Sequence, residues 1–135
     1  MFRLFLLGMV CALVAGCGGI GRNDLSDGAA IYASECAVCH GGNARGGGGG
    51  GVAGLSKTPP DLTGLRLRNG GSFPVYETLE TVEGYAQGGM RGRQMAGIGA
   101  LQSDRKKRAR IDRRRIRSGD RIIDMMVFLE SVQRP

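Results

Sequence analysis

Cys36, Cys39 and His40 are the residues of this 135-residue chain whose types and spacing point most directly to chemistry. Two thiols separated by two residues and followed at once by an imidazole match what covalent attachment of a c-type haem requires. Cys36 and Cys39 can form thioethers with the two vinyl groups on one edge of the porphyrin, and His40 can then bind the iron. The spacing therefore predicts one covalently attached haem.

Two other uses of these residues compete with haem attachment. Structural zinc sites need four ligands, commonly Cys or His, and His40 is the one histidine in the sequence. A redox disulfide between Cys36 and Cys39 is the second alternative, but such motifs normally follow a strand and precede a helix. Here a helical pattern precedes the pair and glycine follows it, so haem attachment is favoured.

The composition also favours a bound prosthetic group. The chain is long enough for one domain, and it has 25 glycines and no tryptophan. Outside the N-terminal leader its aromatic residues are few: Phe73, Phe128, Tyr32, Tyr76 and Tyr85. A small domain with so little apolar material commonly needs a disulfide, a metal or a cofactor to complete its core.

Residues 1–16 have the layout of a secretory signal, with a basic start, an apolar run too short to span a bilayer, and small residues at the end. The end of the run, Leu13-Val14-Ala15-Gly16-Cys17, resembles a bacterial lipobox. We therefore expect a lipid anchor on Cys17 at the periplasmic side of a bacterial membrane and a flexible tether over 17–25. A plain signal peptide with an incidental cysteine is the alternative. Export agrees with haem attachment, which bacteria carry out outside the cytoplasm.

A first helix is predicted to begin near Ser26, a residue typical of helix N-caps. Gly28, Tyr32 and Cys36 are four residues apart, so they share the face that leads to the haem motif. A last helix is predicted after Asp120, and it is apolar on nearly two faces. Such a helix must be covered, and we expect it to pack across the first helix with Phe128 near Tyr32 or Gly28.

A second helix is predicted after Phe73-Pro74, with an apolar stripe, and its end is indicated by Gly88-Gly89. The stripe consists of Tyr76, Leu79, Val82 and Ala86. The glycine-rich stretch 41–54 is interpreted as a loose loop, since no Gly-Lys-Ser/Thr follows and no strand precedes it, as a phosphate-binding loop would need. Pro59-Pro60 supplies carbonyl groups that could accept a hydrogen bond from the far nitrogen of His40.

Taken together, these motifs resemble those of class I cytochromes c. The resemblance extends from about Ser26 to Val132 and rests on these groups of residues: Gly28-x3-Tyr32-x3-Cys36-x2-Cys39-His40, Phe73-Pro74, Glu83-Gly84-Tyr85, a methionine loop, and Ile122-Ile123-x3-Val127-Phe128-Leu129. It implies an all-α fold with about three main helices and loops around one haem c and its iron. The domain would cover 26–135, with a basic insertion at 103–119.

The resemblance also implies the two axial ligands of the iron. One is the histidine of the haem motif, His40, and the other is a methionine sulfur. Met95-Ala96-Gly97-Ile98-Gly99 keeps the family's methionine and closing glycine, although alanine replaces the usual proline and isoleucine the usual aromatic residue. Met95 is therefore the expected distal ligand, and Met90, followed by Arg91, is the alternative.

Such a ligand pair implies an electron carrier and not an enzyme. With both ligands bound, the iron has no open position for a substrate, and the thioether raises its reduction potential. We expect single-electron transfer between redox partner proteins. The competing hypothesis is a c-type haem sensor or peroxidase-like protein with an open or labile distal site, because the loop around Met95 departs from the family pattern.

The net charge of +7 is concentrated in one segment. Residues 105–121 contain ten basic residues against two acidic ones, a local charge of +8. Three interpretations remain open: a solvated, poorly ordered insertion, a surface that docks an acidic redox partner, and attraction to anionic lipid head groups. Nucleic acid is not expected as a partner of an exported chain.

Overall fold

A computed structural model describes residues 22–47, 55–90 and 95–135 of the chain. The expected leader, the lipidation site at Cys17, and residues 48–54 and 91–94 of the two glycine-containing loops lie outside the described residues. None of the helices in the described ranges has the length and apolar content needed to cross a bilayer.

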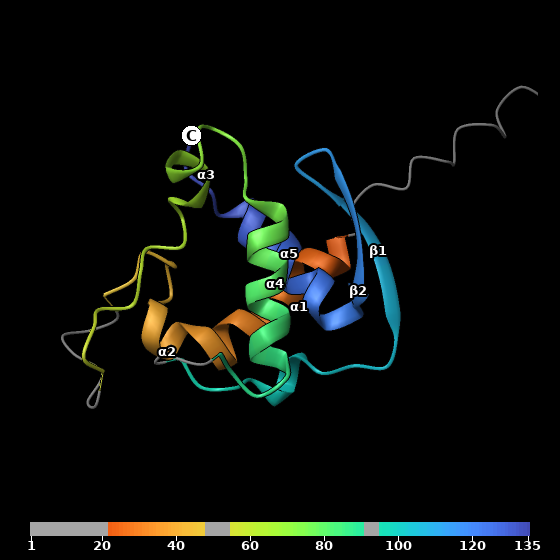
Figure 1. The fold of residues 1–135 in the computed structure, drawn as a ribbon, viewed down its shortest axis with the longest axis horizontal. Helices are drawn as coiled ribbons and strands as arrows, with labels where there is room; N and C mark the ends of the chain where they lie inside the picture. Colours follow the sequence, from red (N-terminus) through yellow and green to blue (C-terminus); the bar gives the residue numbers. More distant parts are fainter. Residues whose placement is uncertain (1–21, 48–54, 91–94) are drawn as a thin grey trace, which may run out of the picture.

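The expectation of an all-α fold with about three main helices is confirmed in that the structure is mostly helical, although it also contains a two-stranded hairpin that was not expected (Figure 1). The elements follow in the order α1 (Arg22–Ile31), π-helical turn η1 (Tyr32–Cys36), α2 (Ala37–His40), α3 (Leu65–Arg68), α4 (Val75–Ala86), 3-10 turn η2 (Gly99–Leu101), β1 (Lys106–Ile111), β2 (Arg114–Gly119) and α5 (Asp120–Ser131). The first helix begins at Arg22, four residues before the expected N-cap, so Ser26 lies inside the helix and not at its start.

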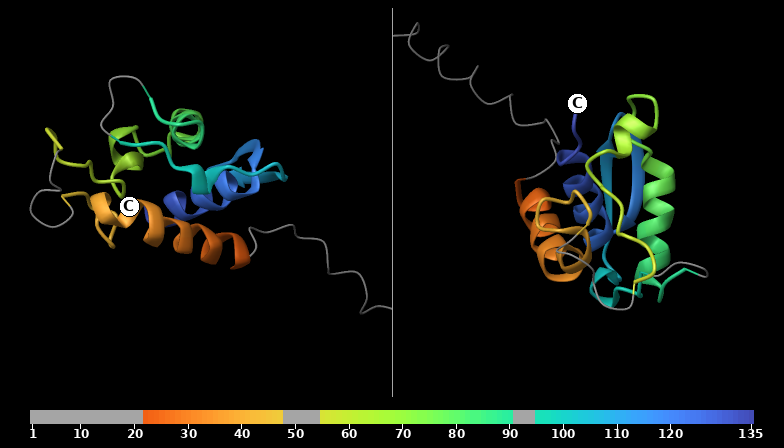
Figure 2. Two further views of the ribbon diagram at one scale, coloured as in Figure 1. Left: turned by 90° about the horizontal axis from the view of Figure 1, so that it is seen from below. Right: turned by 90° about the vertical axis from the view of Figure 1, so that its left-hand side faces the viewer.

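Helices α1 and α5 cross in close contact, as the sequence predicted (Figure 2). Gly28 makes this approach possible, since a Cβ at this position would meet the backbone carbonyl of Asp124 and lie 2.9 Å from the Cβ of Phe128. The rings of Tyr32 and Phe128 pack with centroids 4.7 Å apart at an interplanar angle of 32°. An aromatic pair of this kind contributes about 1 kcal/mol beyond its buried area.

Helix α4 runs from Val75 to Ala86 and ends just before the glycine pair, as expected, but its buried face is rotated from the predicted stripe. Tyr76 is 57% exposed, whereas Val75 and Tyr85 are buried. The first turn of α4 lies beside the turn of the hairpin, where Phe73 and Val75 fill the space against the core. Tyr76 is therefore on the solvent side.

The basic segment is not a poorly ordered insertion but an antiparallel hairpin, with Arg108 opposite Arg117 and Ala109 opposite Ile116. Its inner face buries Ile111 and Ile116 on the core. The two turn residues, Asp112 and Arg113, both have positive φ, of 40° and 65°. Such a turn matches the right-handed twist of paired strands, so the hairpin is a regular part of the fold.

Side-chain hydrogen bonds fix the hairpin turn and β2 to the helices. The Asp112 backbone N–H donates to Glu130 Oε1 at 2.6 Å, and the Phe73 N–H donates to Asp112 Oδ2 at 2.6 Å. The Ser118 hydroxyl donates to Glu83 Oε1 of α4 at 2.5 Å. The hairpin is therefore held on α4 and α5.

Lys107 joins the inner face of β1 to both crossed helices. Its Nζ lies 2.7 Å from Asp24 Oδ1 of α1 and 2.7 Å from Asp124 Oδ1 of α5. Burial alone would lower the pKa of Lys107, but hydrogen bonds to Asp124 and Asp24 raise it. Burial raises the pKa of the Asp124 carboxyl, and the negative charges of Asp24 and Asp27 raise it further, although Lys107 acts in the opposite direction. The ion pairs place the start of α1 beside β1.

Replacing Gly28 with alanine is predicted to destabilise the protein by about 2 kcal/mol or more, since the added methyl group overpacks the crossing of α1 and α5. Thermal unfolding of the purified protein measures the change. Gly99→Ala is the matched control, because a Cβ at Gly99 would have no heavy atom within 4 Å; this variant should stay within about 0.5 kcal/mol of the parent. Equal stability of the two variants would contradict the close crossing.

Candidate functional site

The three motif residues lie at the end of one continuous helical segment formed by α1, η1 and α2. In an α-helix a four-residue step overshoots a full turn by about 40°, so residues four apart drift slowly around the axis. The π-helical turn widens the helix over Tyr32–Cys36 and counters that drift. As a result Gly28, Tyr32, Cys36 and His40 are all buried, whereas Cys39 is half-buried.

Tyr32 ties the start of the π-helical turn to the end of α2. Its hydroxyl donates a hydrogen bond of 2.7 Å to the carbonyl of Gly41, the residue that follows His40. Burial, with a smaller contribution from Cys36, raises the pKa of Tyr32 to about 12, so the hydroxyl keeps its proton at neutral pH. The aromatic residue that packs on α5 therefore also holds the carboxyl end of the motif.

The ring of His40 is held by a backbone carbonyl from the proline segment, as the sequence predicted. His40 Nδ1 lies 3.2 Å from the carbonyl oxygen of Pro60. A carbonyl oxygen can only accept, so Nδ1 carries the proton and Nε2 keeps the lone pair that a metal needs. The His40 backbone carbonyl accepts from the Gly46 N–H at 2.9 Å, so both ends of the residue are fixed.

The glycines of residues 41–47 suggested a loose loop, but backbone hydrogen bonds fix the conformation of this segment. The Gly47 N–H donates to Pro59 O at 3.2 Å, and the Leu62 N–H donates to Ala44 O at 2.8 Å. Gly46 has φ +74°, and a Cβ there would meet the Pro59 carbonyl and lie 2.7 Å from the carbonyl carbon of Pro60. Gly46 is thus required at its position, because a side chain there would displace the Pro59–Pro60 backbone that provides the acceptor for the His40 ring.

Asp61, the residue that follows Pro60, is held by Thr63 and by Arg134 of the C-terminal segment. Asp61 Oδ1 accepts from the N–H and the hydroxyl of Thr63, at 2.8 and 2.6 Å, and Asp61 Oδ2 lies 2.6 Å from Arg134 Nη2. The Thr63 hydroxyl, with further help from Arg134, lowers the pKa of Asp61 from its ordinary value. Sequence reasoning missed this pair, because 73 residues separate Asp61 from Arg134 and no local pattern connects them.

The two candidate methionines differ in their surroundings. A Cβ on Gly84 of α4 would lie 2.9 Å from Met90 Cγ and 3.1 Å from Met90 Sδ, so the Met90 thioether rests against that helix. Met95 is half-buried at the edge of the core. The segment after Met95 is held by a bridge between Gly89 and Ala96 and by the Ile98 N–H, which donates to Tyr85 O at 2.8 Å.

The thiol chemistry of the motif argues against a redox disulfide. Burial, together with the charges of Glu35 and Cys39, raises the pKa of Cys36 to about 11. Thiol–disulfide exchange proceeds through a thiolate, so the raised pKa makes Cys36 a poor attacking group for such exchange. Within the described residues, no three His, Cys, Asp or Glu side chains gather as they would around a metal ion.

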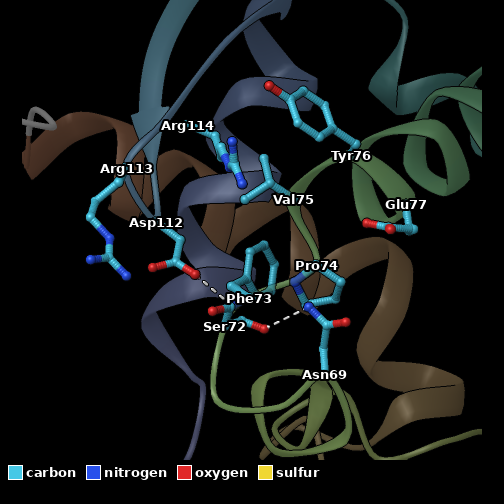
Figure 3. Close-up of a pocket in the computed structure, with 10 residues that line it drawn as sticks. All are labelled: Asn69, Ser72, Phe73, Pro74, Val75, Tyr76, Glu77, Asp112, Arg113 and Arg114. Carbon is cyan, nitrogen blue, oxygen red and sulfur yellow. Dashed lines mark hydrogen bonds between the residues drawn. The ribbon is translucent and has the colours of Figure 1, made fainter.

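A cavity of about 340 Å³ lies elsewhere, between the start of α4 and the hairpin turn (Figure 3). Asp112, Arg113, Tyr76 and Glu77 are among its lining residues, and none of the motif residues borders it. The Asp112 carboxylate in it is already engaged by the Phe73 N–H. The cavity is part of the hairpin junction and has no share in the cysteine and histidine site.

Comparison with known families identifies the chemistry of the site. The family model described as cytochrome c oxidase, cbb3-type, subunit III matches residues 23–111, more than half of the chain. The matched range contains the cysteine and histidine motif, both candidate methionines and β1. No curated protein and no solved structure matches the chain.

The described residues fit the covalent haem c that a cytochrome c domain of this kind carries. Cys36 and Cys39 supply the two thiols, and a histidine with Nε2 free to coordinate follows directly. Thioether sulfurs are present in Met90 and Met95. This combination of donors suits haem iron and its covalent attachment.

Replacing Gly46 with alanine is predicted to destabilise the haem-loaded protein by about 2 kcal/mol, because the left-handed backbone disfavours a side chain and the methyl group displaces the Pro59–Pro60 backbone. Gly42→Ala, in the same loop but with nothing within 4 Å of the added Cβ, is the control and should unfold like the parent. Thermal unfolding followed by haem absorbance measures both. A Gly46 variant as stable as the Gly42 variant would refute the proposed packing.

Proposed function

Because the chain belongs to the cytochrome c family of cbb3-type oxidase subunit III, we propose that it is a lipid-anchored monohaem carrier with His40 and Met95 as its axial ligands. A cytochrome c domain is an electron carrier rather than an enzyme, and it works with redox protein partners. The haem iron supplies a one-electron couple between its ferric and ferrous states. The protein holds the cofactor, sets its potential and presents it to partners.

The hydrogen bond from His40 Nδ1 to Pro60 O carries the proposal for the proximal side. It directs Nε2 toward coordination and makes the imidazole a better donor to iron. The Gly46 N–H and the Tyr32 hydroxyl hold the backbone on either side of the ring, at His40 O and Gly41 O. A ligand fixed at so many points moves little when the iron changes its charge, which suits rapid electron transfer.

Met95 is proposed as the distal ligand on two grounds. It begins the pattern Met95-Ala96-Gly97-Ile98-Gly99, which keeps the methionine and the closing glycine of the family's distal loop. Met90 is followed by Arg91 and so lacks that pattern, and its thioether packs against Gly84 of α4. A thioether ligand favours the ferrous state and raises the potential.

The proposed location is the periplasmic face of a bacterial membrane. Cytochrome c domains are typically extracytoplasmic, and residues 1–16 have the composition of a secretory signal that ends at the lipobox-like Leu13–Cys17. Lipidation of Cys17 would leave a short glycine-rich tether before α1. The redox partners we propose are membrane-bound respiratory proteins, among which a cbb3-type oxidase is a candidate acceptor.

The Met95→Ala variant is predicted to lose the thioether-to-iron absorption band of the ferric protein completely and to have a lower reduction potential. Met90→Ala, which removes the neighbouring thioether, should keep the band. Visible spectra and potentiometric titration of the purified haem-loaded variants measure both properties. Loss of the band in Met90→Ala alone would instead make Met90 the ligand. A high-spin parent protein that binds carbon monoxide on reduction would support the open-site sensor or peroxidase-like function.

Lipidation is predicted to occur at Cys17 and to be abolished by Cys17→Ser. Metabolic labelling with radioactive palmitate, followed by membrane fractionation, should label the parent chain and not the variant. Cys11→Ser is the control, because Cys11 leaves with the leader, and it should label like the parent. Equal labelling of the Cys17 variant would overturn the anchor without affecting the haem chemistry.

A further inference from the structure

One face of the hairpin consists almost entirely of positive charge. Strand residues alternate between two faces, and β1 and β2 direct Ile111 and Ile116 into the core. The charged residues that alternate with them are all exposed. They form what we call the basic face: Lys106, Arg108 and Arg110 of β1 with Arg115 and Arg117 of β2.

Among the described residues, no acidic side chain forms an ion pair with the basic face. Arg108 lies directly opposite Arg117, and Arg110 directly opposite Arg115, although like charges in such positions destabilise a strand pair. Across residues 22–47, 55–90 and 95–135, none of the five side chains makes an ion pair, and the two ion pairs of the strands both use Lys107 on the inner face. The repulsion between these like charges destabilises the strand pair, and no ion pair of the five side chains offsets it. Such a surface is expected where the charges bind an anion outside the protein.

The basic face and the haem motif lie at opposite ends of the molecule. In Figure 1 and in the left view of Figure 2, α2 with its motif residues stands at one end of the long axis and the hairpin at the other. The start of α1 is at the hairpin end, where Asp24 of α1 is held 2.7 Å from Lys107 of β1. The chain therefore enters the domain beside the basic face.

This arrangement favours a membrane over a redox protein as the occupant. Electron transfer slows steeply with distance, so a redox partner gains most by docking at the haem end, far from the hairpin. Cys17 is five residues before Arg22, and a fully extended chain of that length spans at most about 18 Å. A lipid on Cys17 would therefore keep the hairpin end within reach of the bilayer surface.

We propose that the basic face binds the anionic phospholipid head groups of the membrane to which Cys17 tethers the chain, an inference that rests on the lipid anchor of the proposed function. The lipid on Cys17 would keep the domain at the membrane, and attraction between the basic surface and anionic head groups would set the orientation of the domain there. Contact through the hairpin directs the haem end away from the bilayer. Partners would then approach the haem from the aqueous side or from a projecting subunit.

The test uses the haem-loaded mature chain from residue 17 onward, carrying Cys17→Ser and exported with a cleavable non-lipoprotein signal peptide in place of residues 1–16, so that binding reports the basic face without the lipid and without the apolar leader. It should bind vesicles of phosphatidylcholine with phosphatidylglycerol, should not bind pure phosphatidylcholine, and should be released by salt. Adding Arg108→Gln and Arg117→Gln should weaken the partition coefficient roughly 30-fold at low ionic strength. Arg110→Gln with Arg115→Gln, the other cross-strand pair, should act in the same way.

The control, Arg45→Gln with Lys57→Gln, removes two charges from the loops near the haem motif and should leave vesicle binding within about twofold of the parent. If the control weakened vesicle binding as much as the hairpin variants do, the binding would depend on the net charge of the protein and not on the basic face, and the proposal would be overturned. So would unchanged vesicle binding in both hairpin variants, or a hairpin variant that binds vesicles normally but exchanges electrons more slowly with an acidic redox protein. The haem spectra of the hairpin variants should be unchanged. Their unfolding midpoints should be equal to or higher than that of the parent, because the substitutions remove repulsion between like charges. Ligation and lipidation are measured separately, so their failure is distinguishable.

Discussion

The close crossing of α1 and α5 at Gly28 is the contact on which the rest of the structure depends. Because position 28 carries no Cβ, the Asp124 carbonyl can lie directly against α1, which brings Phe128 onto the ring of Tyr32. The hydroxyl of the same tyrosine holds the carbonyl of Gly41 at the end of the haem motif. The orientation of His40 thus depends on the absence of a side chain 12 residues earlier in the chain.

The surroundings of His40 are assembled from three chain segments that meet through hydrogen bonds to backbone carbonyl groups. The helix presents His40, the loop 41–47 fixes its backbone carbonyl, and Pro60 accepts from its ring. Asp61, beside that acceptor, is clamped by Thr63 and by Arg134 near the C-terminus. Backbone acceptors of this kind do not titrate and cannot rotate away, so the histidine keeps one tautomer and one orientation.

The fold also separates two roles along its long axis. The haem motif lies at one end and the hairpin, with its uncompensated cations, at the other. Lys107, Ile111 and Ile116 hold the inner face of the hairpin on the core, so the charged side chains of the outer face are not needed for this packing. With the lipid anchor and the lipid contact proposed above, the surface that meets lipid would not compete with the surface that meets redox proteins.

Much of the candidate site could be predicted from the sequence because its signals are local. The spacing of Cys36, Cys39 and His40 sets which chemistry is available, the four-residue spacing from Gly28 marks the buried face, and Pro59-Pro60 marked the acceptor of the His40 ring. The apolar last helix required a partner. The hairpin was missed, although Ala109, Ile111 and Ile116 alternate with charge, because the run of like charge dominated the short pattern.

Taken alone, the sequence determined the cofactor chemistry, the helical fold class and the pairing of the first and last helices, since short-range spacing records which residues share a face. Only the tertiary structure decided which glycine of a glycine-rich loop is required, that Arg134 holds Asp61, and that five cations form one uncompensated surface. These are relations between segments far apart in the chain. The periodicity of a sequence shows which face of a helix or strand is buried. Which residues from other segments contact that face is decided only by the packing of the folded backbone.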